Sequence, residues 1–337
     1  MRVLITGGAG YIGSHTAKAL WLAGFEPVVY DNLSTGHRWA VKWGPLVEAD
    51  ISDCSALKHA IRQYDITAAI HFAAHAYVGE SMHEPRRYFQ NNVIGTLNLL
   101  EGLLDAGVRR FVFSSSCAVY GIPNVIPIPE DHPKLPVNPY GESKLFIERA
   151  LDWYGRAYDF RWAALLYFNA AGADSSGELG EVHNPETHLL PIVIETAMGK
   201  RGSFEMYGVD YPTTDGTAIR DYVHVSDLAE AHVLALQHLL SNGESFAVNL
   251  GTGHGVSVRE VIAAVQRIAG VSIDARPAPR RPGDPAVLVA CPARADALLR
   301  WRPKFSALDR IVSTAWHWRN LALPNESSIT RCGKDSD

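Results

Sequence analysis

The chain has few cysteines, only 4 among 337 residues. Cys54, Cys117, Cys291 and Cys332 show no paired spacing, so neither a disulfide framework nor a cysteine-based zinc site is expected. We read them as reduced thiols and predict a cytoplasmic protein. The N-terminal MRVLIT is too short for the apolar region of a signal peptide, and no apolar run approaches the roughly 20 residues that span a bilayer. Neither export nor membrane insertion is expected.

The chain also lacks an excess of positive charge. It has 31 Lys and Arg against 36 Asp and Glu, a formal net charge of -5, which does not favour a nucleic-acid partner. Any phosphate binding must therefore come from local geometry. At 47% hydrophobic and 20% charged residues, the composition is that of an ordinary globular protein. A chain of this length buries roughly three quarters of its unfolded surface.

What the sequence does contain is an alternation of short β-branched runs with helical patterns through its first half, from RVLIT to RFVFSSS. This alternation predicts an α/β fold, a Rossmann-type doubly wound parallel sheet covered on both faces. After about residue 172 the chain is richer in Gly, Pro, Asp and Ser, which suits a smaller substrate-binding domain. The segment 217–240 returns to the strand-and-helix pattern. We predict a Rossmann-type domain over 1–172 with that returning segment, an interleaved C-terminal substrate domain over 173–324, and a flexible tail over 325–337.

A glycine-rich loop follows the first expected strand. In VLITGGAGYIGSH, Gly7, Gly10 and Gly13 permit a tight turn and let backbone N–H groups and a helix N-terminus face a pyrophosphate. The second expected strand ends at Asp31, 18 residues after Gly13, where a carboxylate can accept hydrogen bonds from ribose hydroxyls and would repel a 2′-phosphate. Arg38 is the only nearby cation. The pattern favours NAD over NADP.

The segment NPYGESK places Tyr140 and Lys144 four residues apart at the start of a helix, on one face. An ammonium at about 5.5 Å is expected to lower the tyrosine pKa by about two units, which would make the phenol a usable base. An oxidised nicotinamide nearby should lower it further. The preceding strand ends in Ser114, Ser115 and Ser116. We assign Ser116 as hydrogen-bond partner of the reacting hydroxyl and the other two as structural hydroxyls.

Motifs along the chain carry a family resemblance: GGAGYIGS, DNLSTGH, HFAA with VGES, NNVIGTL, SSSCAVYG, NPYGESK, YFNAAGA, DGTAIRDYVHV and RRPGD. With them, residues 1 to 320 resemble the UDP-glucose (UDP-galactose) 4-epimerases of the extended short-chain dehydrogenase/reductase family. The resemblance implies a homodimer with tightly bound NAD. It also implies that Tyr140 removes the proton of the sugar 4-hydroxyl as hydride leaves carbon 4, and that the transient 4-keto sugar turns and takes the hydride back on its other face.

The resemblance further implies individual residue roles. Those around the dinucleotide, besides Gly7, Gly10 and Gly13, would be Tyr11, Ile12, Asp31, Asn32, Asp50, Ile51, Phe72, Ala73, Ala74, Asn91, Lys144 and Phe168. Those around the UDP-sugar would be Ser116, Tyr140, Asn169, His188, Tyr207, Arg220, Tyr222, Arg281 and Asp284. Arginine suits this role because its planar fork matches phosphate oxygens.

Three positions depart from the best-known members. Ala76 stands where those members have a lysine that can approach the cofactor phosphates, and Ala118 stands where many have a threonine. Leu288 falls where the family varies residue size beside carbon 2 of the sugar. The chain also resembles UDP-xylose (UDP-arabinose) 4-epimerases through AYVGES. A pentose substrate and a UDP-N-acetylhexosamine therefore both stay open.

Other reaction classes fit less well. Sugar-nucleotide dehydratases of this fold need an Asp and a Glu directly after the strand-ending Ser or Thr, where this chain has Cys117 and Ala118. A non-catalytic NAD sensor is disfavoured because Tyr140, Lys144 and Ser116 are all intact. Among the 14 histidines, His71 and His75 share no helical face and no carboxylate cluster accompanies them, so no metal is expected.

Overall fold

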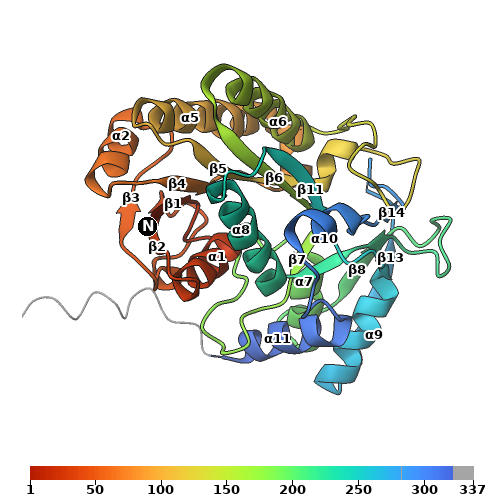
Figure 1. Ribbon diagram of the computed structural model, residues 1–337. Helices are drawn as coiled ribbons and strands as arrows, with labels where there is room; N and C mark the ends of the chain where they lie inside the picture. Colours follow the sequence, from red (N-terminus) through yellow and green to blue (C-terminus); the bar gives the residue numbers. More distant parts are fainter. Residues whose placement is uncertain (282, 322–337) are drawn as a thin grey trace, which may run out of the picture.

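A computed structural model describes residues 1–281 and 283–321; the expected tail over 325–337 lies outside the described residues. Its centre is a seven-stranded parallel sheet with the strand order β11-β6-β5-β4-β1-β2-β3 (Figure 1). The strands are β1 (Arg2–Thr6), β2 (Glu26–Asp31), β3 (Leu46–Glu48), β4 (Ala68–His71), β5 (Arg110–Ser116), β6 (Arg161–Tyr167) and β11 (Phe246–Leu250). The predicted doubly wound Rossmann-type fold is confirmed.

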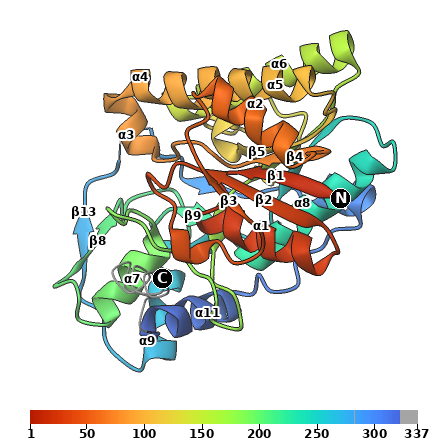
Figure 2. The ribbon, with the colours of Figure 1, turned by 90° about the vertical axis from the view of Figure 1, so that its left-hand side faces the viewer.

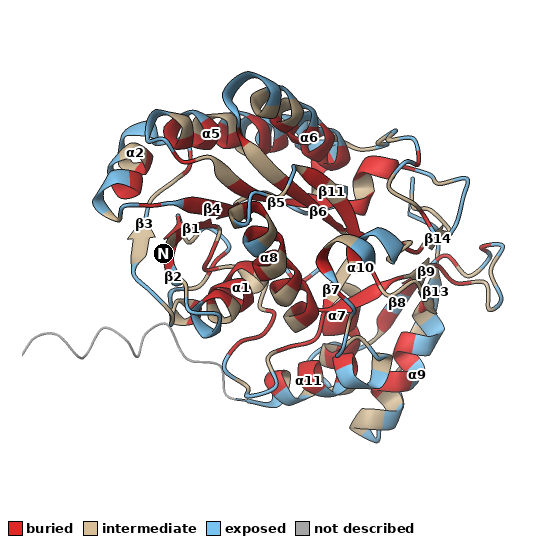
Figure 3. Cartoon of the chain, viewed as in Figure 1, coloured by how far each residue is buried: buried red, intermediate tan, exposed pale blue. Residues whose placement is uncertain are grey.

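Helices cover both faces of this sheet, which is why its strands read as continuous apolar runs. One face packs against α2 (Cys54–Gln63), α5 (Thr96–Asp105) and α6 (Pro139–Tyr158). The other packs against α1 (Tyr11–Leu22), α8 (Val225–Leu240) and α10 (Ala293–Leu299). Figure 3 shows the buried residues of the sheet between these two layers.

A smaller lobe with its own apolar core lies below the sheet (Figure 2). It contains the helices α7 (Leu189–Ala197), α9 (Val258–Ala269) and α11 (Leu308–Asn320). Three small sheets lie in or beside it: β7 (Asn169–Ala171) with β10 (Tyr222–His224), β8 (Phe204–Tyr207) with β13 (Ala275–Ala278), and β9 (Ile219–Arg220) between β12 (Val256–Ser257) and β14 (Val287–Leu288).

The chain crosses between the two parts more than once. After β7 it enters the smaller lobe, returns to the large sheet through α8 and β11, and leaves again towards α9. Of the segment 217–240, α8 packs against α1 and β5 of the sheet domain, whereas β9 and β10 pair in the small sheets, and β11 follows α8 into the large sheet.

Two details refine the expected elements. The helical pattern NNVIGTLNLLEGLLDAG, residues 91–107, lies in a π-helical turn, Phe89–Gly95, that continues as α5. Short helices α3 (Val78–His83) and α4 (Pro85–Tyr88) precede it. Within the described residues, none of the helices combines the length and apolar character that crossing a membrane requires.

Candidate active site

The glycine loop joins β1 to α1 through a turn that only glycine fits. Gly7 has φ +72°, and a Cβ there would lie 2.5 Å from the Ala73 nitrogen. A Cβ on Gly13 would lie 2.3 Å from the Gly7 carbonyl oxygen. Gly10 caps α1 without a capping side chain, and the first turn of α1 has no acidic residue. An uncapped helix N-terminus of this kind favours an anion such as a pyrophosphate.

Asp31 ends β2 beside this loop and is 7% exposed. Its carboxylate accepts hydrogen bonds from the Ala9 nitrogen (3.0 Å) and the Leu33 nitrogen (2.8 Å). Burial raises its pKa, and these two hydrogen bonds work against that rise. Because each carboxylate oxygen can accept a second hydrogen bond, ribose hydroxyls could still bind here. Asn32 donates to Asp50 Oδ2 at 2.6 Å, so these two expected cofactor residues form one group.

Tyr140 and Lys144 lie on the first turns of α6, which begins where the sequence predicts. The Asn138 side chain caps the helix by accepting from the Gly141 nitrogen at 2.8 Å, and Pro139 occupies the first turn. Both side chains are buried, with Tyr140 9% and Lys144 3% exposed. Lys144 Nζ lies 5.8 Å from the centre of the Tyr140 ring and donates to the Ser114 carbonyl oxygen at 2.8 Å. The pair is therefore fixed at the carboxyl end of β5.

Their protonation differs from the expectation. Burial raises the pKa of Tyr140 to about 12, although a hydrogen bond with Ser116 lowers it in part. Burial likewise lowers the pKa of Lys144 to about 7, and Glu148 only partly offsets this. The expected lowering of the Tyr140 pKa by Lys144 is wrong for this structure, because burial is the largest influence on the pKa of both groups.

The serines that end β5 have distinct partners. Ser114 hydrogen-bonds with the Tyr167 hydroxyl, and Ser115 donates to Glu148, as structural hydroxyls would. Ser116 is the serine that hydrogen-bonds with Tyr140. Its Oγ also accepts a hydrogen bond from the Ala118 nitrogen at 3.2 Å.

The sequence analysis missed Asn92, the neighbour of Asn91. Its side chain accepts from the His75 nitrogen at 2.8 Å and donates to Ser143 Oγ at 3.1 Å, so it links the loop after β4 to α6. Asn91 in turn donates to Asn92 Oδ1 at 2.9 Å. Both lie in the π-helical turn, a feature that often marks functional sites. The two adjacent asparagines in NNVIGTL are the sequence feature that indicates a role for Asn92 beside Asn91.

Several expected substrate residues gather in the smaller lobe. Arg220 pairs with Asp284 at 2.5 Å, and the Arg281 guanidinium lies 4.3 Å from the centre of the Tyr207 ring. Tyr222 is buried, close enough to Arg220 and Asp284 for both to act on its pKa.

Cys117 connects this group to the catalytic pair. Burial raises the pKa of the Cys117 thiol to about 12, and Arg220 lies near enough to oppose the rise. Cys117 also acts on the pKa of Tyr140. Cys117 therefore lies within electrostatic range of both Arg220 and Tyr140.

Not every expected cofactor residue directs its side chain to the site. The Phe72 ring packs against His232 of α8, with 4.7 Å between ring centres, and Ile51 packs beneath Gly95. Ile51 belongs to the apolar core on one face of the large sheet, and Phe72 packs against the apolar core on the other face. Any contact of Phe72 with a cofactor would involve its backbone or the edge of its ring.

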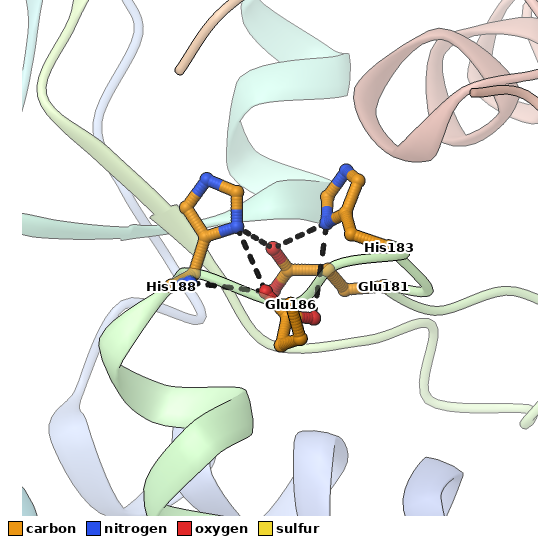
Figure 4. Close-up of side chains that lie close together, drawn as sticks. All are labelled: Glu181, His183, Glu186 and His188. Atoms are coloured by element: carbon orange, nitrogen blue, oxygen red, sulfur yellow. Dashed lines mark hydrogen bonds and ion pairs between the residues drawn. The ribbon is translucent and has the colours of Figure 1, made fainter. Parts of the chain in front are cut away.

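The loop between β7 and α7 brings together a cluster that the sequence analysis did not foresee (Figure 4). Glu181, His183, Glu186 and His188 place one possible metal-ligand atom each within 4.8 Å of one another. Burial opposes protonation of the histidines, but the two glutamates outweigh it and raise the pKa of His183 to about 9 and of His188 to about 10. The spacing E-x-H-x-x-E-x-H was visible in the sequence, whereas the loop conformation that joins the four was not.

Comparisons with known proteins agree with this geometry. The sequence profile of the NAD dependent epimerase/dehydratase family matches residues 3–251. A UDP-glucose 4-epimerase of Rhizobium meliloti is 48% identical over 318 residues, covering 94% of this chain and 97% of that protein. The crystal structure of UDP-glucose 4-epimerase from Brucella ovis in complex with NAD is 52% identical, with a TM-score of 0.92 over 94% of this chain and 98% of that one.

A UDP-glucose 4-epimerase from Stenotrophomonas maltophila with bound NAD and formylated UDP-arabinopyranose is 39% identical, with a TM-score of 0.91. That alignment covers 98% of this chain and 99% of the other.

Proposed function

The chain belongs to the NAD dependent epimerase/dehydratase family, and from this membership we propose that it interconverts UDP-glucose and UDP-galactose by inverting carbon 4 of the sugar. It is an NAD-dependent isomerase that passes through a transient 4-keto sugar. The observation that carries the proposal is the buried Tyr140, which hydrogen-bonds to Ser116 at the carboxyl end of β5 and has Lys144 on the same helix face.

The residues of the chain have separable tasks in this reaction. NAD, when bound, supplies the hydride acceptor and later the hydride donor. Tyr140 takes the proton of the 4-hydroxyl on its phenolate oxygen and returns it after the sugar has turned. Ser116 holds the reacting oxygen by a hydrogen bond, and Lys144 stabilises the phenolate because it can carry positive charge beside it. The buried setting excludes water from the keto intermediate.

We assign the remaining roles as follows. The dinucleotide is held by the glycine loop and by Tyr11, Ile12, Asp31, Asn32, Asp50, Ile51, Phe72, Ala73, Ala74, Asn91, Lys144 and Phe168. The uridine and diphosphate are held by Asn169, His188, Tyr207, Arg220, Tyr222, Arg281 and Asp284. The domain division at residues 172 and 173 with the return over 217–240 belongs to the same proposal, and the interleaved chain path supports it.

Turnover without added cofactor tests the function. Purified protein is incubated separately with UDP-galactose, UDP-arabinose and UDP-N-acetylgalactosamine, and the epimer of each is measured. Conversion of UDP-galactose is expected, because NAD is regenerated in each cycle and stays bound. Conversion of UDP-arabinose or UDP-N-acetylgalactosamine without UDP-galactose would replace the proposed substrate by a pentose or an N-acetylhexosamine. No conversion of any of the three would refute the proposal.

We also propose that the protein is a cytoplasmic homodimer joined through α6 and its neighbours. Large apolar side chains are exposed there: Trp153 at 66%, Phe146 at 49% and Ile94 at 54%. Phe146 and Trp153 are seven residues apart and so share one face of α6, and Ile94 lies in the π-helical turn that packs against α6. Such a patch suits a second copy of the chain. Trp153→Glu should yield monomer in light scattering; a wild-type monomer would refute the dimer.

A further inference from the structure

The four residues of the Glu181 to His188 cluster lie in one 8-residue stretch of the loop between β7 and α7. Both carboxylates are buried, with side chains 8% and 3% exposed. In Figure 4 the Nδ1 side of each imidazole faces the carboxylates, while the Nε2 atoms point away from them. None of these side chains takes part in the proton transfer assigned to Tyr140.

The distances between the possible ligand atoms suit a small divalent cation. Glu181 Oε1 lies 3.2 Å from His183 Nδ1 and 2.9 Å from His188 Nδ1. Glu186 Oε1 lies 3.1 Å from His188 Nδ1, and the other oxygen of that carboxylate, Oε2, lies 3.8 Å from His183 Nδ1. In a tetrahedral site with bonds of about 2.0–2.1 Å, neighbouring ligand atoms are about 3.4 Å apart. The four distances bracket that value.

Hydrogen bonding satisfies the cluster only in part. Of the four nitrogen–oxygen contacts, the one between His188 and Glu186 has the geometry of a hydrogen bond. The buried Nδ1 of His183 makes none, although a buried polar atom normally has such a partner. Two ligands of one metal ion lie at about this distance from each other, without the alignment that a hydrogen bond between them would need.

The charge around the cluster also leaves room for a cation. Arg319 of α11 pairs with Glu186 at 2.9 Å and with Glu195 at 3.1 Å, so its charge is shared. Metal binding displaces the protons that the two glutamates otherwise favour on His183 and His188, and once both imidazoles are neutral Glu181 has no permanent cation within ion-pair distance among the described residues. Two tyrosines also lie near the cluster: the centre of the Tyr77 ring is 6.1 Å from that of His183 and 6.0 Å from that of His188, and Tyr11 is close enough for both glutamates to raise its pKa. They bring no charge at neutral pH.

We propose that Glu181, His183, Glu186 and His188 bind one divalent transition-metal ion of the zinc class. Two imidazole nitrogens and two carboxylate oxygens form a ligand set that suits Zn²⁺, and four protein ligands close the site to substrate. The ion is structural. This proposal goes beyond the proposed epimerase activity and does not rest on it.

The ion would fasten the loop where the two lobes meet. The loop contacts the sheet domain through Tyr77 and through His37, whose Nε2 lies 3.1 Å from the Val182 carbonyl oxygen, and contacts α11 through Arg319. Binding of the metal by Nδ1 also fixes the proton of each ring on Nε2. His188 would then present a constant N–H donor away from the carboxylates.

The test measures metal uptake by the full-length, NAD-loaded protein, purified without a histidine tag. After treatment with a chelator and desalting, the protein is titrated with Co²⁺ and then with Zn²⁺. Uptake of one Co²⁺ per chain is expected, with the visible absorption of four-coordinate Co²⁺, which Zn²⁺ should abolish. No uptake of either ion by the wild-type protein would overturn the proposal, whatever the variants do.

Two ligand variants and one control complete the experiment. His183→Gln and Glu181→Gln should each weaken Co²⁺ binding by at least about a hundredfold, since even a supporting residue beyond the ligands is worth a factor of about 10 to 100. His59→Gln changes an exposed histidine and should bind as the wild type does. Circular dichroism without metal shows whether each variant is folded. Equal uptake by all four proteins would place the metal elsewhere and overturn the proposal in favour of imidazolium–carboxylate pairs.

Discussion

Buried histidines occur in two regions of this molecule and behave in opposite ways. In the sheet domain, burial lowers the pKa of His71 to about 3 and of His232 to about 4. In the loop cluster between the lobes, His183 and His188 are held near pKa values of about 9 and 10. The difference lies in the partners: His71 contacts the hydroxyls of two threonines, whereas the cluster histidines face two carboxylates. Burial excludes charge unless an opposite charge is buried with it.

Tyr140 and Lys144 behave like the buried histidines of the sheet domain, in which burial favours the neutral form. Among the described residues no carboxylate forms an ion pair with Lys144, and Glu148, the acid that acts on its pKa, is engaged by Lys134 and Ser115. Tyr140 and Lys144 are consequently both driven towards their neutral forms. Among the described residues, Tyr140 and Lys144 thus form no fixed ion pair. A charge brought by a bound ligand therefore has a large effect on the pKa values of these two side chains.

The largest expected effect tests the catalytic side of this comparison. Tyr140→Phe removes the hydroxyl that moves the proton and should lower the turnover number by about a thousandfold, within the usual range for general acid–base catalysis. Bound NAD, measured by absorbance after denaturation, should be retained because the glycine loop is intact. Near wild-type turnover would remove the role given to Tyr140.

Lys144→Met should lower the turnover number by about a hundredfold, because the phenolate loses the one cation on its helix face. The matched control is Lys58→Met, which removes an exposed lysine paired with Asp105 at 2.7 Å on α2 and α5. The control should keep wild-type turnover in the same UDP-galactose assay. Equal rates for the two variants would show that the buried ammonium is dispensable.

Arg319→Met tests whether the region between the lobes depends on paired charge. Its guanidinium is 10% exposed and serves two carboxylates, so its loss should lower the free energy of unfolding by about 3 kcal/mol. Arg276→Met removes an exposed pair with Asp274, which solvent screens, and should lower the free energy of unfolding far less. Both are measured by urea unfolding. A similar small loss in both variants would contradict the distinction between buried and exposed pairs.

The smallest effect concerns a neutral histidine of the sheet domain. His232 has a folded-state pKa of about 4 against 6.5 when unfolded, so the unfolded chain binds the extra proton between these values. Stability should therefore fall as the pH drops from 6.5 to 4. In His232→Leu this fall should be shallower, by up to about 1.4 kcal/mol per pH unit. Parallel pH profiles from urea unfolding would show that His232 has the same pKa in the folded and the unfolded protein.

Local sequence signals predicted the loop, the helix start and the strand ends that form the candidate active site. The glycine loop is readable because Gly7 and Gly13 occupy positions that no side chain fits. Asn138 and Pro139 mark the start of α6, which puts Tyr140 and Lys144 on one face. Asp31 and Ser116 each end a strand, and their place in the site was predictable because a parallel sheet gathers the carboxyl ends of its strands at one edge.

Long-range contacts were beyond the same reasoning. Asn92 was passed over in favour of Asn91 because the link to His75 and Ser143 spans 17 and 51 residues. The expected lowering of the Tyr140 pKa failed because spacing along a helix gives a separation but not the depth of burial.

The sequence alone determined the α/β alternation, the cofactor loop and the Tyr140 and Lys144 pair, because each depends on residues within one turn or one strand-to-helix connection. The tertiary structure decided which charges survive inside the protein, because solvation depends on everything packed around a group. Burial favours the neutral form of Lys144, whereas Glu181 and Glu186 favour the protonated form of the partly exposed His188.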